Sequence, residues 1–102
     1  MYRYQYTKKE KAIMYIKADL SRQGLSYEDV AKMIRSRPTF VARAFETLHL
    51  TNSLIVKLNQ TFRYSAEFML NFNGPMYVDK ETPELVVDFP SKTPNLLESV
   101  KT

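Results

Sequence analysis

Apolar residues recur every three to four positions along the first 72 residues of the chain, which is the period of an amphipathic helix. Short polar connections divide this pattern into five stretches, each with an apolar stripe on one face. The expected helices cover about residues 8–22, 26–35, 38–48, 51–59 and 65–72. Five short helices with brief connections predict a compact, mainly α-helical domain.

Local signals mark where these helices begin and end. Thr7 and Glu10 form a capping-box pattern at the start of the first helix, and Gly24 is placed to end it. The Asn-Gly-Pro sequence at residues 73–75 interrupts the fifth. The helical part is therefore expected to stop at this breaker.

The pattern changes after this point. Residues 76–78 and 85–89 contain β-branched and aromatic side chains and predict two strands, which residues 80–84 would join as a hairpin. A lone two-stranded hairpin is marginally stable in water. We therefore expect this segment either to pack on the helices or on a partner, or to form an extended tail.

Residues 22–48 predict two short helices joined by a tight basic turn. Ser26 is a good N-cap for the first helix, Asp29 completes a start like a capping box, and Pro38 fits the first turn of the second helix. The outer face of the second helix carries Arg37, Thr39, Arg43 and Thr47. Two helices with small apolar stripes and this outer face suit insertion into the major groove of DNA.

Two arginines are the first candidates for contacting bases. The planar guanidinium groups of Arg37 and Arg43 can bond guanine O6 and N7, and each such pair is worth about 1–3 kcal/mol of discrimination. Thr39 is small enough to allow close approach and to touch a thymine methyl group. The alternative role of Arg43 is an ion pair with Glu46 or Glu28.

Other candidates flank this helix. Ser26 and Tyr27 lie at a helix N-terminus, where backbone N–H groups favour a phosphate, and Arg35 adds a phosphate contact. Phe40 can reach a base step. The alternatives are that Tyr27 covers the core and that Phe40 packs on the first helix or on a partner. The candidate DNA-binding residues are Ser26, Tyr27, Arg35, Arg37, Thr39, Phe40, Arg43 and Thr47.

Charge is distributed unevenly along the 102-residue chain, whose net charge is +4. Residues 1–66 hold twelve Lys and Arg against five Asp and Glu, whereas residues 67–102 hold three against six. A solvated surface can give this asymmetry by chance, but it also suits a polyanionic partner for the first two-thirds of the chain.

Composition argues against other chemistry. The chain has no cysteine, so disulfides and thiolate metal sites are excluded. His49 is its single histidine, so a His-based metal cluster or a catalytic dyad lacks its other members. It has no apolar run long enough to span a bilayer and no signal-peptide pattern. We therefore predict a cytoplasmic protein that is not an enzyme and needs no cofactor or metal.

The segment that begins with Gly-Leu-Ser at residues 24–26 resembles the helix-turn-helix of phage repressor and Cro-type regulators. In that family a nearly invariant Ala follows such a start, with an aliphatic residue ten positions later and another apolar residue three after that. Ala31, Val41 and Ala44 stand at those positions. The likeness extends over about residues 8–72 and implies a five-helix, repressor-like fold that binds double-stranded DNA in a sequence-specific way.

The resemblance has departures and a second register. Arg35 and Ser36 stand where the family usually has Gly and an aliphatic residue. Residues 48–59 also resemble the family's turn and recognition helix, and in that register the groove-facing residues are Thr51, Asn52, Ser53, Val56 and Lys57. We favour the register of residues 38–48 for its Gly-Leu-Ser start and its greater positive charge.

Residues around Phe40 are also similar to the N-terminal helical domain of cyanase, but nothing after residue 75 resembles that enzyme's catalytic segment. We expect a dimeric repressor, with the hairpin and tail as candidate dimerisation element, as the resemblance to Cro-type proteins implies. Residues 1–75 form the DNA-binding domain, whose alternating Tyr2, Tyr4 and Tyr6 predict a strand or an arm on DNA. The alternative function is a protein-interaction module on the same fold, for example antitoxin-like or a phage-encoded inhibitor.

Overall fold

The computed structural model describes residues 6–85 and 87 of the chain. Within these residues the chain forms five α-helices and no β-strand. The helices are α1 (Lys8–Arg22), α2 (Tyr27–Ile34), α3 (Pro38–Glu46), α4 (Asn52–Phe62) and α5 (Ala66–Asn71). The prediction of five helices and a mainly α-helical domain is confirmed, although α3 ends two residues earlier than expected and α4 ends three residues later.

Both expected ends of α1 are present. The hydroxyl of Thr7 accepts a hydrogen bond from the Glu10 N–H at 3.1 Å, and the Glu10 carboxylate accepts one from the Thr7 N–H at 2.9 Å. After the last turn, Gly24 adopts φ +78° and the Leu25 N–H donates to the Leu20 carbonyl at 3.0 Å. A glycine in this left-handed conformation is the usual way to end a helix.

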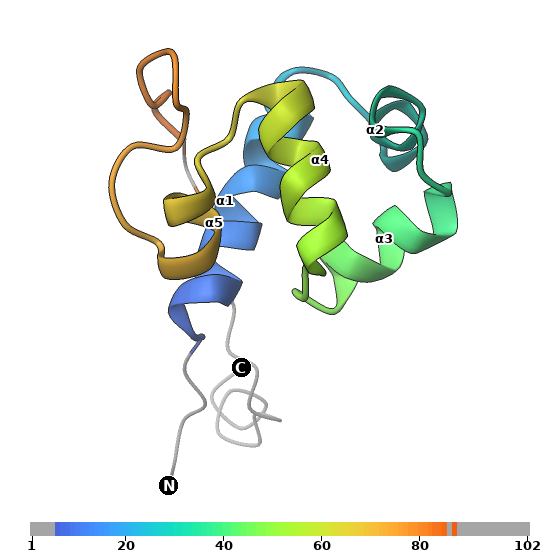
Figure 1. Ribbon diagram of the computed structural model, residues 1–102, viewed down its shortest axis with the longest axis horizontal. Helices are drawn as coiled ribbons and strands as arrows, with labels where there is room; N and C mark the ends of the chain where they lie inside the picture. The colour runs from blue at the N-terminus through green and yellow to red at the C-terminus, as the bar shows by residue number, and fades with distance from the viewer. Residues whose placement is uncertain (1–5, 86, 88–102) are drawn as a thin grey trace, which may run out of the picture.

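The five helices pack around one core, with different pairs of helices at its two ends. α1 packs against α5, α2 packs against α3, and α4 contacts both α2 and α5. The α2–α3 pair therefore lies at one end of the molecule, and α5 with the chain that follows it lies at the other (Figure 1). The core is built mainly from the apolar stripes of the helices, including Ile13, Ile16, Leu20, Val30, Ile34, Val41, Phe45, Leu54, Leu58, Phe68 and Met69.

The hairpin expected after residue 75 is not formed among the described residues. Residues 76–78 lie instead beside residues 63–65, with an isolated antiparallel bridge between Tyr77 and Tyr64. The physical reason is that Met76 and Tyr77 are buried in the helical core, which holds their segment against the end of α4. Most of the second expected strand, of the N-terminal arm and of the candidate dimerisation element lies outside the described residues.

One carboxylate is buried in the core. Asp19 on α1 is 0% exposed, and its Oδ1 accepts hydrogen bonds from the Arg22 guanidinium at 2.8 and 2.9 Å. Its Oδ2 accepts from the Tyr64 hydroxyl at 2.7 Å, from the Gln23 amide at 3.0 Å and from the Tyr77 hydroxyl. We call these five residues the Asp19 cluster. It joins α1 to the segments that follow α4 and α5.

The Asp19 cluster holds its carboxylate in the charged form. Burial acts to raise the pKa of Asp19, but the hydrogen bonds from Tyr77, Tyr64 and Arg22 outweigh it and lower the pKa below its usual value. Burial raises the pKa of Tyr64 and of Tyr77 beside this carboxylate. Both phenols therefore remain protonated donors at neutral pH. Their rings also stack, with centroids 4.9 Å apart.

Candidate nucleic-acid interface

The turn between α2 and α3 repeats the geometry that ends α1. The Ser36 N–H donates to the Ala31 carbonyl at 2.8 Å, and Arg35 adopts φ +57°, ψ +52°. Arg35 therefore takes the left-handed position that Gly24 takes after α1. This conformation costs free energy for a residue that carries a side chain. The ammonium group of Lys57 on α4 donates to the Arg35 carbonyl at 3.4 Å, which links the turn to the body of the protein.

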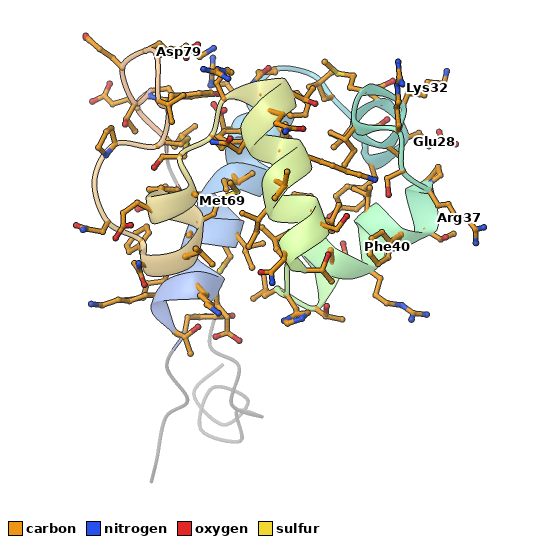
Figure 2. All side chains as sticks on the ribbon, in the orientation of Figure 1. Glu28, Lys32, Arg37, Phe40, Met69 and Asp79 are labelled. Carbon is orange, nitrogen blue, oxygen red and sulfur yellow. The ribbon has the colours of Figure 1, made fainter. Side chains whose placement is uncertain are left out.

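The second helix of this pair presents a polar face outward. Arg37 is the N-cap of α3 and makes no side-chain cap, so its guanidinium is not held by the helix it starts. Val41, Ala44 and Phe45 are buried against the other helices, while the expected groove residues of α3 are exposed. These exposed residues are Thr39, Phe40 and Arg43, together with Arg37. Figure 2 shows Arg37 at the outer edge of the molecule, pointing away from the core.

The arginines at this end form no ion pair within residues 6–85 and 87. The ion pairs among all described residues join Lys17 to Glu46, Arg22 to Asp19 and Arg63 to Asp79. The side chains of Arg35, Arg37 and Arg43 form no hydrogen bond within the same residues. The ion pair of Arg43 with Glu46 or Glu28, weighed above as an alternative, is not formed. Three guanidinium groups therefore stand in solvent around the turn and the outer face of α3.

Glu46 is held by the neighbouring helices. Its Oε2 accepts a hydrogen bond from the Tyr27 hydroxyl at 2.9 Å and lies 3.7 Å from the Lys17 ammonium. The Tyr27 ring stacks on Phe45 with centroids 5.8 Å apart, so Tyr27 covers the core as well as binding Glu46. Burial, followed by the bond to Glu46, raises the pKa of Tyr27. Burial opposes the charge of Lys17, but Tyr27 and Glu46 outweigh it and raise its pKa.

The start of α2 is occupied by the chain itself. The Ser26 hydroxyl accepts from the Asp29 N–H at 3.1 Å and donates to the Asp29 carboxylate at 3.0 Å, and the Ser26 N–H also donates to that carboxylate. These bonds to Ser26 lower the pKa of Asp29, so its charge stays at this helix end. With Glu28 also in the first turn, two carboxylates stand where a phosphate would bind.

The end of α3 holds Thr47 and leads into the residues of the second register. The Thr47 hydroxyl donates to the Arg43 carbonyl at 2.7 Å and is thus engaged at the C-cap. The α3–α4 connection holds five residues, with Leu48 at φ +55°, against three residues between α2 and α3. In that second register Asn52, Ser53 and Val56 are exposed, whereas Lys57 is half-buried and bonded to the turn, and Thr51 is half-buried as the cap of α4.

The eight candidate residues thus divide into groups. Arg37, Thr39, Phe40 and Arg43 share the exposed surface of α3, and Arg35 lies in the turn beside them. Ser26, Tyr27 and Thr47 have hydroxyl groups engaged within the chain. Sequence reasoning missed the roles of Asp19 and Glu46. A signal existed for Asp19, which stands three residues after Ile16 on an apolar stripe.

Neither a metal-binding cluster nor a membrane-spanning helix is present in residues 6–85 and 87. This part of the chain contains no group of three or more His, Asp or Glu residues arranged to hold a metal ion. None of its helices has both the length and the apolar character to cross a membrane. No known protein family, curated protein or solved structure matches the chain.

Proposed function

We propose that this protein is a small transcriptional regulator that binds double-stranded DNA in a sequence-specific way and acts as a dimeric repressor. In this proposal α2, the turn and α3 (residues 27–46) form a helix-turn-helix, with α3 as the recognition helix. The observation that carries it is the exposed surface of α3, where Arg37 and Arg43 have no carboxylate partner within the described residues.

Geometry favours this register over the α3–α4 alternative. The helix-turn-helix of DNA-binding proteins has a turn of three to four residues. The three residues 35–37 between α2 and α3 meet this requirement, while five residues separate α3 from α4. Thr51 is also tied to the start of α4, where its hydroxyl accepts from the Leu54 N–H at 3.3 Å. The surface of α3 therefore offers more side chains that can contact base edges than the surface of α4 does.

Dimerisation follows from the small size of this surface. One helix of nine residues reaches too few base pairs for tight discrimination, and a two-fold dimer doubles the contacts over a palindromic site. Residues 76–102 remain the proposed dimerisation element. Val78, at their start, is one of the exposed large apolar residues.

The test is selection of binding sites from a random pool of DNA duplexes by the full chain. We expect an inverted repeat with half-sites about 10 base pairs apart, centre to centre. On the selected duplex, Arg43→Ala and Arg37→Ala should each weaken binding about tenfold, as the loss of one bidentate guanine contact requires. Affinity must be measured at two salt concentrations, because phosphate contacts alone also give salt-sensitive binding.

Two matched variants make the result specific. Arg63→Ala removes an exposed arginine that lies after α4, outside α3, and is paired with Asp79, so it should leave the affinity almost unchanged. Asn52→Ala probes the alternative register. A larger loss from Asn52→Ala than from Arg43→Ala would move the recognition helix to α4, and failure to enrich any sequence would reject DNA recognition.

The alternative function, a protein-interaction module on the same fold, is favoured by one observation. Exposed apolar side chains stand on three different helices and the chain after them, at Met33, Phe40, Val56 and Val78. Phe40 is 41% exposed on α3 itself. Under this alternative the selection enriches no DNA sequence, and Phe40→Ser rather than Arg43→Ala removes binding to the partner.

A further inference from the structure

A pocket lies between α1 and α2, apart from the exposed surface of α3 that is proposed to contact the bases. Its volume is about 300 Å³, which falls at the lower end of the range for small-molecule sites. Leu20 on α1, Leu25 in the connection and Val30 on α2 line it, and the Tyr27 ring completes the apolar wall. Ser21 and Ser26 also line it. We call it the α1–α2 pocket.

The α1–α2 pocket has a charge of one sign. Lys17 is the single charged residue that lines it. The Lys17 ammonium lies 6.0 Å from the centre of the Tyr27 ring. It lies 3.7 Å from the Glu46 carboxylate, which is long for an ion pair, and the side chains of Lys17 and Glu46 are both substantially exposed. An exposed ion pair contributes little free energy, about 0–1 kcal/mol, and is readily exchanged for another anion.

We propose that the α1–α2 pocket binds a small amphipathic monoanion. An aromatic ring or short alkyl chain would occupy the space among Leu20, Leu25 and Val30, and its carboxylate would bind the Lys17 ammonium. The apolar lining supplies affinity through burial, and the lone cation selects an anion over a neutral molecule of the same shape.

The same pocket is coupled to α3 through residues already in contact. Lys17 and Tyr27 both line the pocket and both bind Glu46, which is the acidic residue of α3. A carboxylate at Lys17 takes the counterion away from Glu46 and adds a further negative charge nearby. Resting on the proposed function, we infer that the ligand weakens DNA binding, because phosphates are repelled by both carboxylates.

Binding to the pocket is tested first without DNA. The full chain, labelled with ¹⁵N, is titrated with sodium phenylacetate, and the amide resonances of Leu20, Leu25 and Val30 are followed. We expect saturable shifts at these positions in the millimolar range, which is normal for a ligand of ten heavy atoms. Phenylacetamide has the same shape without the charge and should bind at least fivefold more weakly.

Two lysine variants give the matched comparison. Lys17→Met keeps the length and apolar stem of the side chain but removes the charge, so it should weaken phenylacetate binding at least fivefold. Lys9→Met removes an exposed lysine from the same helix, away from the pocket, and should leave the dissociation constant unchanged. Absence of saturable shifts, or equal affinity in wild type and Lys17→Met, would overturn the proposal.

The coupling to DNA is tested on the duplex selected above. Phenylacetate at saturation should lower the affinity of the wild type about threefold or more, while Glu46→Gln should still bind phenylacetate but show a smaller effect on DNA. If the wild type binds phenylacetate and no DNA sequence is ever enriched, the proposed function fails and the pocket stands. If DNA binds and phenylacetate does not, the pocket fails and the proposed function stands.

Discussion

The two ends of this molecule use charge in opposite ways. At the α5 end, the Asp19 carboxylate accepts bonds from four side chains, and none of its oxygens is left for a partner. At the α2–α3 end, Arg37 and Arg43 form no ion pair with the described residues. The Asp19 cluster pairs its charges inside the fold, whereas the guanidinium groups of Arg37 and Arg43 stand in solvent at little cost to stability.

The difference separates the groups that stabilise the fold from the groups that a ligand can reach. A buried, fully bonded carboxylate is costly to disturb but recognises nothing outside the protein. An exposed guanidinium contributes little to the fold and is available for a ligand. Stability and binding should therefore respond to substitutions at different ends, and each prediction below tests that separation.

The largest effect is expected from Asp19→Asn. The amide cannot accept the bonds of both tyrosines and Arg22, so the free energy of unfolding should fall by about 3 kcal/mol. Urea denaturation followed by circular dichroism measures this change. The control is Asp79→Asn, which breaks an exposed ion pair and should change stability by about 0.5 kcal/mol or less. Similar losses in the two variants would contradict the division.

Acid should weaken the same end by a smaller amount. Because the pKa of Asp19 is lower in the folded protein than in the unfolded chain, its contribution is fully present above the unfolded value of about 3.9. It is then lost as the pH falls through the folded value. Unfolding of the wild type measured from pH 7 to pH 2 should show this decline, and Asp19→Asn should show a flatter profile. Parallel profiles would assign the acid sensitivity elsewhere.

The next effect has the opposite sign and lies at the α2–α3 end. Arg35→Gly relieves a side chain at φ +57° and should stabilise the protein by about 1 kcal/mol. Gly24→Ala places a side chain in the equivalent position after α1 and should destabilise it by about the same amount. Thermal unfolding of the two variants checks both signs. A loss of stability in Arg35→Gly would show that its side chain, and not its backbone, supports the turn.

The smallest change in stability is expected from Glu46→Gln. The ion pair with Lys17 is exposed, so the free energy of unfolding should change by about 0.5 kcal/mol or less. Removing this negative charge from α3 should nevertheless strengthen DNA binding, measured by fluorescence anisotropy on the selected duplex. Equal affinities would mean that Glu46 lies away from the DNA phosphates.

Most of the fold was predictable because its signals are local. The capping box of Thr7 and Glu10, the stop at Gly24 and the helical stripes each depend on residues a few positions apart. The pairing of residues 76–78 with residues 63–65 was not predicted, because apolar strand-like residues do not specify what they pack against. Burial of Met76 and Tyr77 among helices decided it.

The candidate site was predicted less completely for the same reason. The exposure of Arg37, Thr39 and Arg43 follows from helical periodicity, so the sequence carried it. The engagement of Tyr27 with Glu46 and Lys17 joins three helices and has no signal along the chain. The left-handed turn at Arg35 was hidden because no glycine marks it.

The Asp19 cluster also has a consequence for the order of folding. Tyr64 and Tyr77 lie 45 and 58 residues along the chain from Asp19, whereas the bond from Tyr27 to Glu46 spans 19. Closing long loops is entropically slower, so the α2–α3 pair is expected to assemble early and the Asp19 cluster late. Kinetic measurements on Asp19→Asn should therefore show faster unfolding with little change in the folding rate. This carboxylate would then determine how slowly the native state unfolds.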